Sequence, residues 1–394
     1  MKTLIEIHAL QNFAPSNLNR DDTGAPKDAF FGGTRRARVS SQCLKRSIRQ
    51  YFSGLVEQNA LASDDVALRT KRVMDALTKS LIEKGRAKAE ATDKARLALE
   101  AMELKVKDDG KSEYLLFLGQ REISSVANII HEKWDYINVS GTAPVEGKKP
   151  GKAKKQAAQG ADPELKKALD EVFNGGKALD VALFGRMLAD MPKKNQYAAC
   201  QVAHAISTHA LEREFDFYTA VDDLKPEDTA GADMMGTVEF NSACFYRYAV
   251  VDWEKLVANL QDDRELAAKG LRAFLEGFVV AEPTGKQNTF AAHNPPEFVT
   301  VSVHRNTAPR SLANAFETAV RVKKDESLTK ESATRLSSKA VALDKLYGTP
   351  PNSRYAVAED LFGEKYEAKG LGEKMDSITA LISWALSEVS KKEG

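Results

Sequence analysis

The 394-residue chain has little cysteine and no long apolar run. Its three cysteines, Cys43, Cys200 and Cys244, are widely spaced and odd in number, so they provide neither a disulfide framework nor a CxxC metal knuckle. Sparse cysteine of this kind is typical of a reducing compartment. No stretch approaches the roughly 18 to 20 apolar residues that span a membrane, and the N-terminal TLIEIHAL alternates instead of forming the apolar core of a signal peptide. We therefore expect a cytoplasmic protein that does not bind a membrane.

The usual catalytic signatures are also missing. HExxH and CxxC do not occur, and the Gly-Lys-Gln at 285–287 lacks both the Ser/Thr and the upstream glycine of a phosphate-binding loop. His204 and His209 are five residues apart, on different faces of either a helix or a strand, so we do not expect them to share a metal. The other histidines are isolated in sequence, and we expect structural roles for His8, His131, His293 and His304. The sequence therefore predicts no catalytic site, no metal and no other cofactor.

The charge is balanced overall but concentrated locally. The chain has 57 basic and 56 acidic residues, a net charge of +1, and its length suggests two to three domains of roughly 150 residues each. Eight of the basic residues fall between Asn19 and Arg49, around a Gly32-Gly33 turn. Such a density of lysine and arginine in one segment is typical of a phosphate-binding surface, even on a neutral protein.

The second half of this segment predicts a cationic helix. Ser40 can cap it, because a serine hydroxyl accepts a hydrogen bond from an amide of the first turn. At about 100° per residue, one face carries Gln42, Lys45, Arg46 and Arg49, and the opposite face carries Leu44, Ile48 and Tyr51. The amides of the helix N-terminus would add partial positive charge beside Ser40, where a phosphate oxygen could bind.

The rest of the pattern predicts an α+β fold. Strands are expected at Thr3–Leu10, 201–208 and 238–250, and helices over most of 55–104 and at 311–322, 330–346 and 376–389. The segment 212–236 is too long and acidic for a tight turn, so we expect a functional excursion there. The lysine-rich insert at 147–156 is predicted to be a flexible loop, and its contact with RNA or DNA stays open.

The wording of several segments resembles one known family. The strings LNRDD, KDAFFGG and RRARVSSQCLKRSIR are followed in order by ALFGRM at 182–187, AHAISTH at 203–209, FYTAVDDL at 217–224, FYRYA at 245–249 and GKQNTFAAHNP at 285–295. Together they closely resemble the CasC family, the CRISPR RNA (crRNA)-binding backbone subunit of the type I-E CRISPR complex Cascade. The resemblance is strongest in residues 1–52 and 181–321 and weak between about 55 and 175.

The resemblance implies an architecture and a set of partners. It implies a ferredoxin-like, RNA-recognition-like palm at 1–54 and 179–394, helical fingers at 55–178 and a long thumb hairpin near 210–238. Family members do not cleave RNA; several copies assemble along one CRISPR RNA in an antiviral complex that recognises target DNA by guide pairing. The expected partners are therefore the guide, further copies of the chain, target DNA through the guide, and the large, small, cap and repeat-processing subunits.

The resemblance also assigns residues. Guide-RNA contacts are carried over to Lys27, Arg35, Arg36, Ser40, Gln42, Lys45, Arg46, Arg49, Arg186 and Met187. The thumb residues that would interrupt base stacking are Tyr218, Thr219 and Val221, with Met187 pressing from the palm side. Without the resemblance, the aromatic and β-branched residues of this stretch would be interpreted as the core of a strand. The roles of Met234 and Met235, at the polar tip, stay open.

The acidic pairs keep a rival function open. Asp21-Asp22 and Asp222-Asp223 could hold a divalent metal for phosphodiester cleavage, or they could cap turns, repel the wrong strand or bind a neighbouring subunit's arginines. The rival is an RNA endonuclease on a ferredoxin-like fold, for repeat processing or for target cleavage as in type III complexes. His8, on the first strand, would be its best general acid/base.

Overall fold

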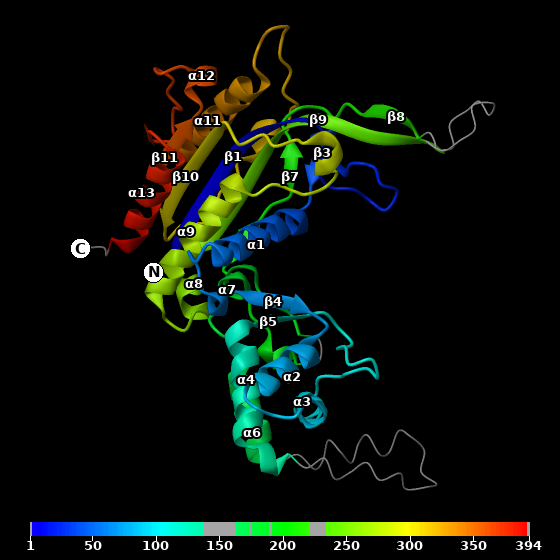
Figure 1. Ribbon diagram of the computed structural model, residues 1–394. Helices are drawn as coiled ribbons and strands as arrows, with labels where there is room; N and C mark the ends of the chain where they lie inside the picture. The colour runs from blue at the N-terminus through cyan, green and yellow to red at the C-terminus, as the bar shows by residue number, and fades with distance from the viewer. Residues whose placement is uncertain (1, 138–162, 174, 189–190, 221–233, 392–394) are drawn as a thin grey trace, which may run out of the picture. The chain divides into compact units, whose positions relative to one another are not determined.

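Figure 1 shows a computed structural model of the protein, which describes residues 2–137, 163–173, 175–188, 191–220 and 234–391. The chain divides into two compact units. The first comprises Met1–Phe52, Cys200–Glu254 and Ala268–Gly394, and the second comprises Ser53–Ala199 and Lys255–Ala267. The division into palm and fingers stays a prediction.

The first unit is built on a mixed sheet. Within the described residues the sheet has ten strands, with β12, β11, β10, β1, β9, β7, β3 and β2 in spatial order and with β6 and β8 also paired to β9. The strands are β1 (Thr3–Ser16), β2 (Asp28–Phe31), β3 (Thr34–Val39), β6 (Cys200–Val202), β7 (Ala205–Ser207), β8 (Glu214–Ala220), β9 (Met234–Asp252), β10 (Phe298–Arg305), β11 (Asn352–Val357) and β12 (Glu373–Lys374).

Strand β1 lies at the centre of this sheet. It pairs antiparallel with β9 on one side and with β10 on the other, so that Ile7 lies opposite both Ala249 and Val301. Its first nine residues are buried, because both faces of the sheet are covered. The helices of this unit are α1 (Ser41–Glu57), whose last turn enters the second unit, α9 (Arg264–Val280), whose first turn belongs to the second unit, α10 (Gln287–Phe290), α11 (Leu328–Tyr347), α12 (Glu359–Phe362) and α13 (Ile378–Ser390), with the 3₁₀ turn η4 (Ala313–Phe316).

The second unit is mainly helical. A two-stranded sheet of β4 (Ala67–Thr70) and β5 (Leu116–Gly119) accompanies α2 (Val73–Glu83), α3 (Lys88–Ala101), α4 (Gln120–Glu132), α6 (Pro163–Val172), α7 (Leu179–Phe184), α8 (Trp253–Asn259) and the 3₁₀ turns η1 (Ser63–Asp65), η2 (Trp134–Tyr136) and η3 (Pro192–Lys194). Its core is formed by buried aliphatic side chains of α2, α3 and α4, among them Leu77, Leu81, Leu99, Val126 and Ile130.

The prediction of an α+β fold is confirmed, and most of the expected helices are present, as are the strands expected at Thr3–Leu10 and 238–250. The strand expected at 201–208 is divided into β6 and β7. The first strand extends beyond Leu10 to Ser16. The helix expected at 311–322 is wrong: only a 3₁₀ turn forms at Ala313–Phe316. An α-helix would give the carbonyl of Phe316 to the N–H of Val320, but that carbonyl accepts from Arg36, and Val320 donates instead to Thr208 O at 2.9 Å.

None of the helices in the described part of the chain is long and apolar enough to cross a membrane.

Candidate nucleic-acid interface

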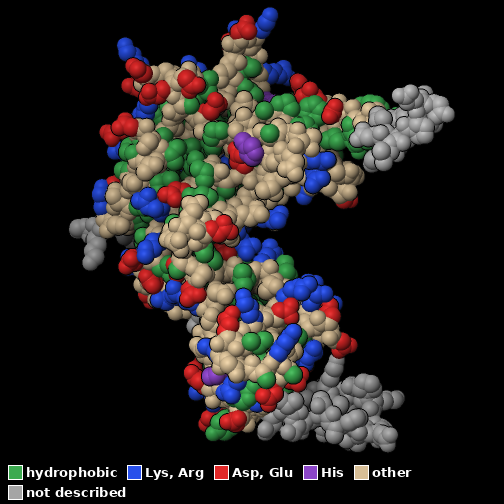
Figure 2. Space-filling view, in the orientation of Figure 1, with side chains coloured by type: hydrophobic (Ala, Val, Ile, Leu, Met, Phe, Trp, Pro, Cys, Tyr) green, Lys and Arg blue, Asp and Glu red, His purple; other side chains and the backbone are tan. Residues whose placement is uncertain are grey.

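Helix α1 carries the cationic face that the sequence predicts. Ser40 caps it as expected, because its Oγ accepts a hydrogen bond from the N–H of Cys43 at 3.3 Å. The first backbone hydrogen bond of the helix runs from the N–H of Leu44 to Ser40 O at 3.1 Å. Leu44 and Ile48 are buried as predicted, whereas Gln42 and Arg46 are exposed. The side chains of Lys45 and Arg49 are half-buried. Figure 2 shows Lys and Arg side chains interspersed with Asp and Glu side chains over this face of the molecule.

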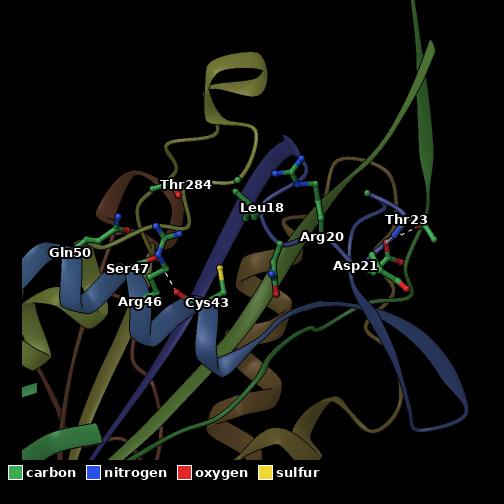
Figure 3. A pocket seen from close by; sticks show the side chains of 13 residues that line it. Leu18, Arg20, Asp21, Thr23, Cys43, Arg46, Ser47, Gln50 and Thr284 are labelled. Atoms are coloured by element: carbon green, nitrogen blue, oxygen red, sulfur yellow. Dashed lines mark hydrogen bonds between the residues drawn. The ribbon is translucent and has the colours of Figure 1, made fainter. Parts of the chain in front are cut away.

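An open hollow of about 600 Å³ lies beside this helix. Figure 3 shows Cys43, Arg46 and Gln50 of α1 on one side of the hollow and the loop that carries Arg20 and Asp21 on the other. The third wall is the Gly-Lys-Gln loop, represented in the lining by Thr284 and Gly285. The hollow is therefore lined by three separate segments of the chain, and two of them contribute an arginine to the lining, Arg20 and Arg46.

The hollow depends on a close approach of two backbones. A Cβ atom added to Gly285 would lie 2.2 Å from Leu18 O, so only glycine allows the two loops to meet. The loop after Leu18 is further fixed by Asn17, whose amide donates to Gly24 O and to Glu239 O, both at 3.0 Å. Asn19 then ties it to α1, because its Oδ1 accepts from the N–H of Ser40 at 2.8 Å. The wall is thus held by side chains that sequence analysis had not singled out.

Asp21 caps a turn in this loop. Its Oδ1 accepts hydrogen bonds from the N–H and hydroxyl of Thr23, at 2.9 and 2.7 Å, and from the N–H of Ala25 at 3.0 Å. These hydrogen bonds, the Thr23 hydroxyl first, lower the pKa of Asp21. Of the roles left open for the acidic pairs, turn capping is the one that the geometry shows here. Asp222 and Asp223 lie outside the described residues.

Positive charge also gathers at the N-terminus of α1. His204 Nδ1 lies 3.2 Å from Nη1 of Arg38 and accepts a hydrogen bond from the N–H of Ser41 at 3.4 Å. Partial burial, followed by the charges of Arg38 and Lys27, lowers the pKa of His204. An imidazole that accepts from cationic and amide donors is neutral, so it leaves the positive potential of the helix N-terminus intact.

Arg35 is exposed but already has a partner. Its Nη1 lies 2.8 and 2.7 Å from the two carboxylate oxygens of Asp28, and Arg213 of the segment before β8 binds the same carboxylate. Burial alone would raise the pKa of Asp28, but hydrogen bonds from Arg35 and Arg213 hold it below its usual range. The Arg35 guanidinium also lies 4.5 Å from the ring centroid of Phe30, which is 69% exposed. Arg35 can thus meet a phosphate only in competition with Asp28.

Arg36 does not reach the surface, contrary to the sequence prediction. It is fully buried, and its guanidinium donates to the backbone carbonyls of Ser207, Thr208, Phe316 and Glu317 at 2.8 to 3.2 Å. The reason is the alternation of β3, which turns Arg35 outward and its neighbour inward. Burial lowers the pKa of Arg36. In this structure Arg36 ties β3 to two other segments of its unit.

Arg186 is also buried, whereas Met187 is not. Nη1 of Arg186 pairs with Glu122 Oε2 at 2.7 Å, and neither side chain has any exposed surface. The same Glu122 accepts from the N–H groups of Gly119 and Gly175, both at 2.8 Å. Met187 is 79% exposed. The structure therefore leaves only the second residue of this predicted pair available to a ligand.

The described part of the predicted thumb is a two-stranded hairpin of β8 and β9. All seven residues of β8 are exposed, among them Tyr218 at 41% and Thr219. Phe215 and Phe217, which the sequence-based site did not include, are 63% and 64% exposed, and Met235 of β9 is 67% exposed. Val221, and the lysine-rich insert at 147–156, lie outside the described residues.

His8, the candidate general acid/base, lies in the interior. It is 1% exposed, its Nδ1 is 2.8 Å from Tyr246 Oη, and its Nε2 is 3.7 Å from Glu6. His304 Nε2 lies 2.8 Å from the same Glu6 carboxylate. In this conformation His8 cannot contact a scissile phosphate. In the part of the chain that the structure describes, no three His, Cys, Asp or Glu side chains are placed to hold a metal ion.

Comparisons with known proteins agree on one class. A solved chain described as "CRISPR RNA-guided surveillance complex, pre-nicking" is 32% identical, with a TM-score of 0.81 over 98% of this chain and 99% of that chain. Another, described as "CRISPR RNA-guided surveillance complex", is 26% identical, with a TM-score of 0.70 over the same shares. The fold is thus that of chains found in such complexes. A family model described as "CT1975-like protein" matches residues 5–384, and the protein belongs to that family. No curated protein matches the chain.

Proposed function

We propose that this protein is a non-catalytic crRNA-binding backbone subunit of a type I-E CRISPR surveillance complex. The observation that carries the proposal is the likeness to a chain of a CRISPR RNA-guided surveillance complex over 98% of this protein and 99% of that one. The family match from residue 5 to residue 384 supports it independently. The type I-E assignment rests on the motifs that resemble the CasC family.

The surface of α1 suits the phosphate backbone of RNA. Exposed Gln42 and Arg46, with half-buried Lys45 and Arg49, present amide and cationic donors along one helix face. The amides at the N-terminus of α1 and the neighbouring Arg38 add positive potential at its start. Contacts of this kind fix the position of a nucleic acid without reading its sequence. Such a grip leaves the bases of a guide free to pair with target DNA.

The hairpin of β8 and β9 suits assembly of several copies on one guide. Three large apolar side chains, Phe215, Phe217 and Met235, are each more than 60% exposed in a single chain, which is unusual for a surface that meets only water. A contact between this hairpin and a different surface of the next copy would be heterologous, and heterologous contacts that do not close produce a helical filament. Other subunits of the complex would end the filament.

The absence of catalysis is part of the proposal. The buried position of His8 gives it no access to a phosphodiester, and the hydrogen bonds that Asp21 Oδ1 accepts from Thr23 and Ala25 favour a turn-capping role. In this conformation the endonuclease alternative therefore lacks His8, its best candidate for a general acid/base.

Co-expression with a CRISPR RNA tests the proposal. The purified complex is sized by chromatography with light scattering, and its RNA is sequenced. We expect several copies of the chain on an intact guide. A monomer that releases cut repeat fragments, with or without divalent metal, would overturn the proposal in favour of the endonuclease.

A further inference from the structure

Two neighbouring side chains of the second unit are the most exposed of the large apolar residues described. Met187 is 79% exposed and Tyr197 is 80% exposed. Met187 directly follows the buried Arg186, and Tyr197 directly follows Gln196, whose side chain is turned toward Asn259. The resemblance to the CasC family gives a role to Met187 but none to Tyr197.

A bridge between two chain segments places these residues on one face. Arg186 and Gln196 form an antiparallel bridge with reciprocal N–H···O hydrogen bonds, each 3.0 Å long. Side chains alternate in such a pair, so the residues after Arg186 and Gln196 point to the opposite side, toward solvent. Met187 and Tyr197 are diagonal neighbours on that outward face, a relation that separates such residues by about 7 to 8 Å.

The backbone beneath them is rigid. Asn259 Nδ2 donates to Tyr197 O and to Ala182 O, both at 2.9 Å, while Gln196 Nε2 donates to Asn259 O at 3.1 Å. A Cβ atom on Gly185 would lie 2.8 Å from Gln196 O, so the two segments touch. The buried ion pair of Arg186 and Glu122 further fixes the backbone that carries Met187 and Tyr197. A surface that is already rigid loses little conformational entropy when a ligand binds.

The charged residues near the Tyr197 ring indicate which class of ligand it would bind. The ammonium of Lys255 lies 5.2 Å from the centroid of the Tyr197 ring, and Lys193, between the two segments, is exposed. A rigid aromatic ring with a cation at one face suits a planar base attached to a phosphate. Protein–protein interfaces are depleted in lysine relative to the rest of the surface, so a lysine against the ring favours a nucleic acid over a protein partner.

We infer that Tyr197 is a base-stacking residue: one unpaired base of the bound RNA lies on its free ring face, with the Met187 thioether beside it. This inference rests on the proposed function and adds a contact to it. Stacking on an aromatic ring tolerates any base, so the contact would hold a guide of any sequence.

The test compares single-residue variants of the full chain on a short single-stranded RNA that contains 4-thiouridine. Base stacking on an aromatic side chain corresponds to about a tenfold loss of affinity when it is removed. We expect this loss for Tyr197→Ala, near-wild-type affinity for Tyr197→Phe, and an ultraviolet crosslink that maps to Tyr197. Tyr136→Ala is the matched control, because Tyr136 is 69% exposed in the same unit and should not contribute.

The outcomes separate the two claims. Wild-type protein that does not bind RNA overturns the proposed function and this inference together. Binding that weakens in Lys45→Ala/Arg49→Ala but not in Tyr197→Ala, without a crosslink at Tyr197, overturns this inference alone. Loss of association between copies in Tyr197→Ala at unchanged affinity for the short RNA would identify a protein contact and would also overturn it.

Discussion

Nη2 of Arg36 donates a hydrogen bond to the backbone carbonyl of Phe316 at 2.8 Å, although 280 residues separate them. The same guanidinium serves the carbonyls of Glu317, Ser207 and Thr208. An arginine from the most basic segment of the chain thus stabilises the fold and does not reach the surface. The local density of positive charge overstates the number of cations that can meet RNA.

Replacing Arg36 should destabilise the protein. Arg36→Met removes the donor from four backbone carbonyls in the interior, and unsatisfied buried groups cost about 1 to 3 kcal/mol each before relaxation. We expect the free energy of unfolding to fall by about 3 kcal/mol, measured by urea denaturation. Arg35→Met is the control, because an exposed ion pair with Asp28 is worth about 1 kcal/mol or less. Equal effects of the two changes would contradict the structural role of Arg36.

Removing two charges from α1 should weaken RNA binding and its salt dependence. Each phosphate contact to single-stranded nucleic acid contributes about 0.7 to the slope of log K against log salt, so Lys45→Ala with Arg49→Ala should lower that slope by about 1.4. The measurement is the affinity for RNA at salt concentrations between roughly 50 and 300 mM. Lys330→Ala with Lys339→Ala removes the same charge from α11 and should leave the slope unchanged. A wild-type slope in the α1 variant would exclude α1 from the site.

The thumb variant should separate binding from spacing. Tyr218→Ala shortens an exposed aromatic side chain of β8 without removing a charge, so binding to a short RNA should stay nearly intact. On a full guide, we expect the regular nuclease footprint of successive copies to lose its period. Thr334→Ala, on the exposed part of α11, is a control distant in sequence. An unaltered footprint in the Tyr218 variant would refute its assignment as a wedge between bases.

Acid should destabilise the first unit through Glu6. Burial alone would raise the pKa of Glu6, but hydrogen bonds from His304 and His8 lower it from 4.5 to about 2. A carboxyl group with a lowered pKa stabilises the folded state above its unfolded pKa, and this contribution is lost as the pH falls from about 4.5 toward 2. Urea titrations across this range should show that the free energy of unfolding falls as the pH falls. The slope of that free energy against pH should be smaller in Glu6→Gln, by an amount that corresponds to up to one proton per molecule. The same pH dependence in both proteins would contradict the assignment.

Local signals in the sequence were sufficient for α1 but not for the arginines around it. A serine cap and a 3.6-residue period are local, and both reappear in the hydrogen bond of Ser40 and the burial of Ile48. The inward turn of Arg36 depends on strand pairing across the sheet. Alternation along a strand places Arg35 and Arg36 on opposite faces, but the neighbouring strands decide which face is buried.

Other errors have the same origin. The expected helix at 311–322 has an adequate apolar period, but Arg36 and Thr208 compete for its backbone groups, and tertiary hydrogen bonds cannot be predicted from local propensity. The sequence did not indicate a role for Phe30 or Tyr197, because the exposure of a single aromatic side chain cannot be predicted from its local sequence. Their significance depends on the cations beside them, Arg35 and Lys255, which only the fold supplies.

The number of copies bound as a function of guide length tests the central claim most directly. Native mass spectrometry of the chain assembled on RNAs of increasing length measures it. A backbone subunit predicts that copies are added in regular steps as the RNA lengthens, with the RNA mass intact. A copy number that stays at one on every length, or RNA that is shortened, would contradict the account.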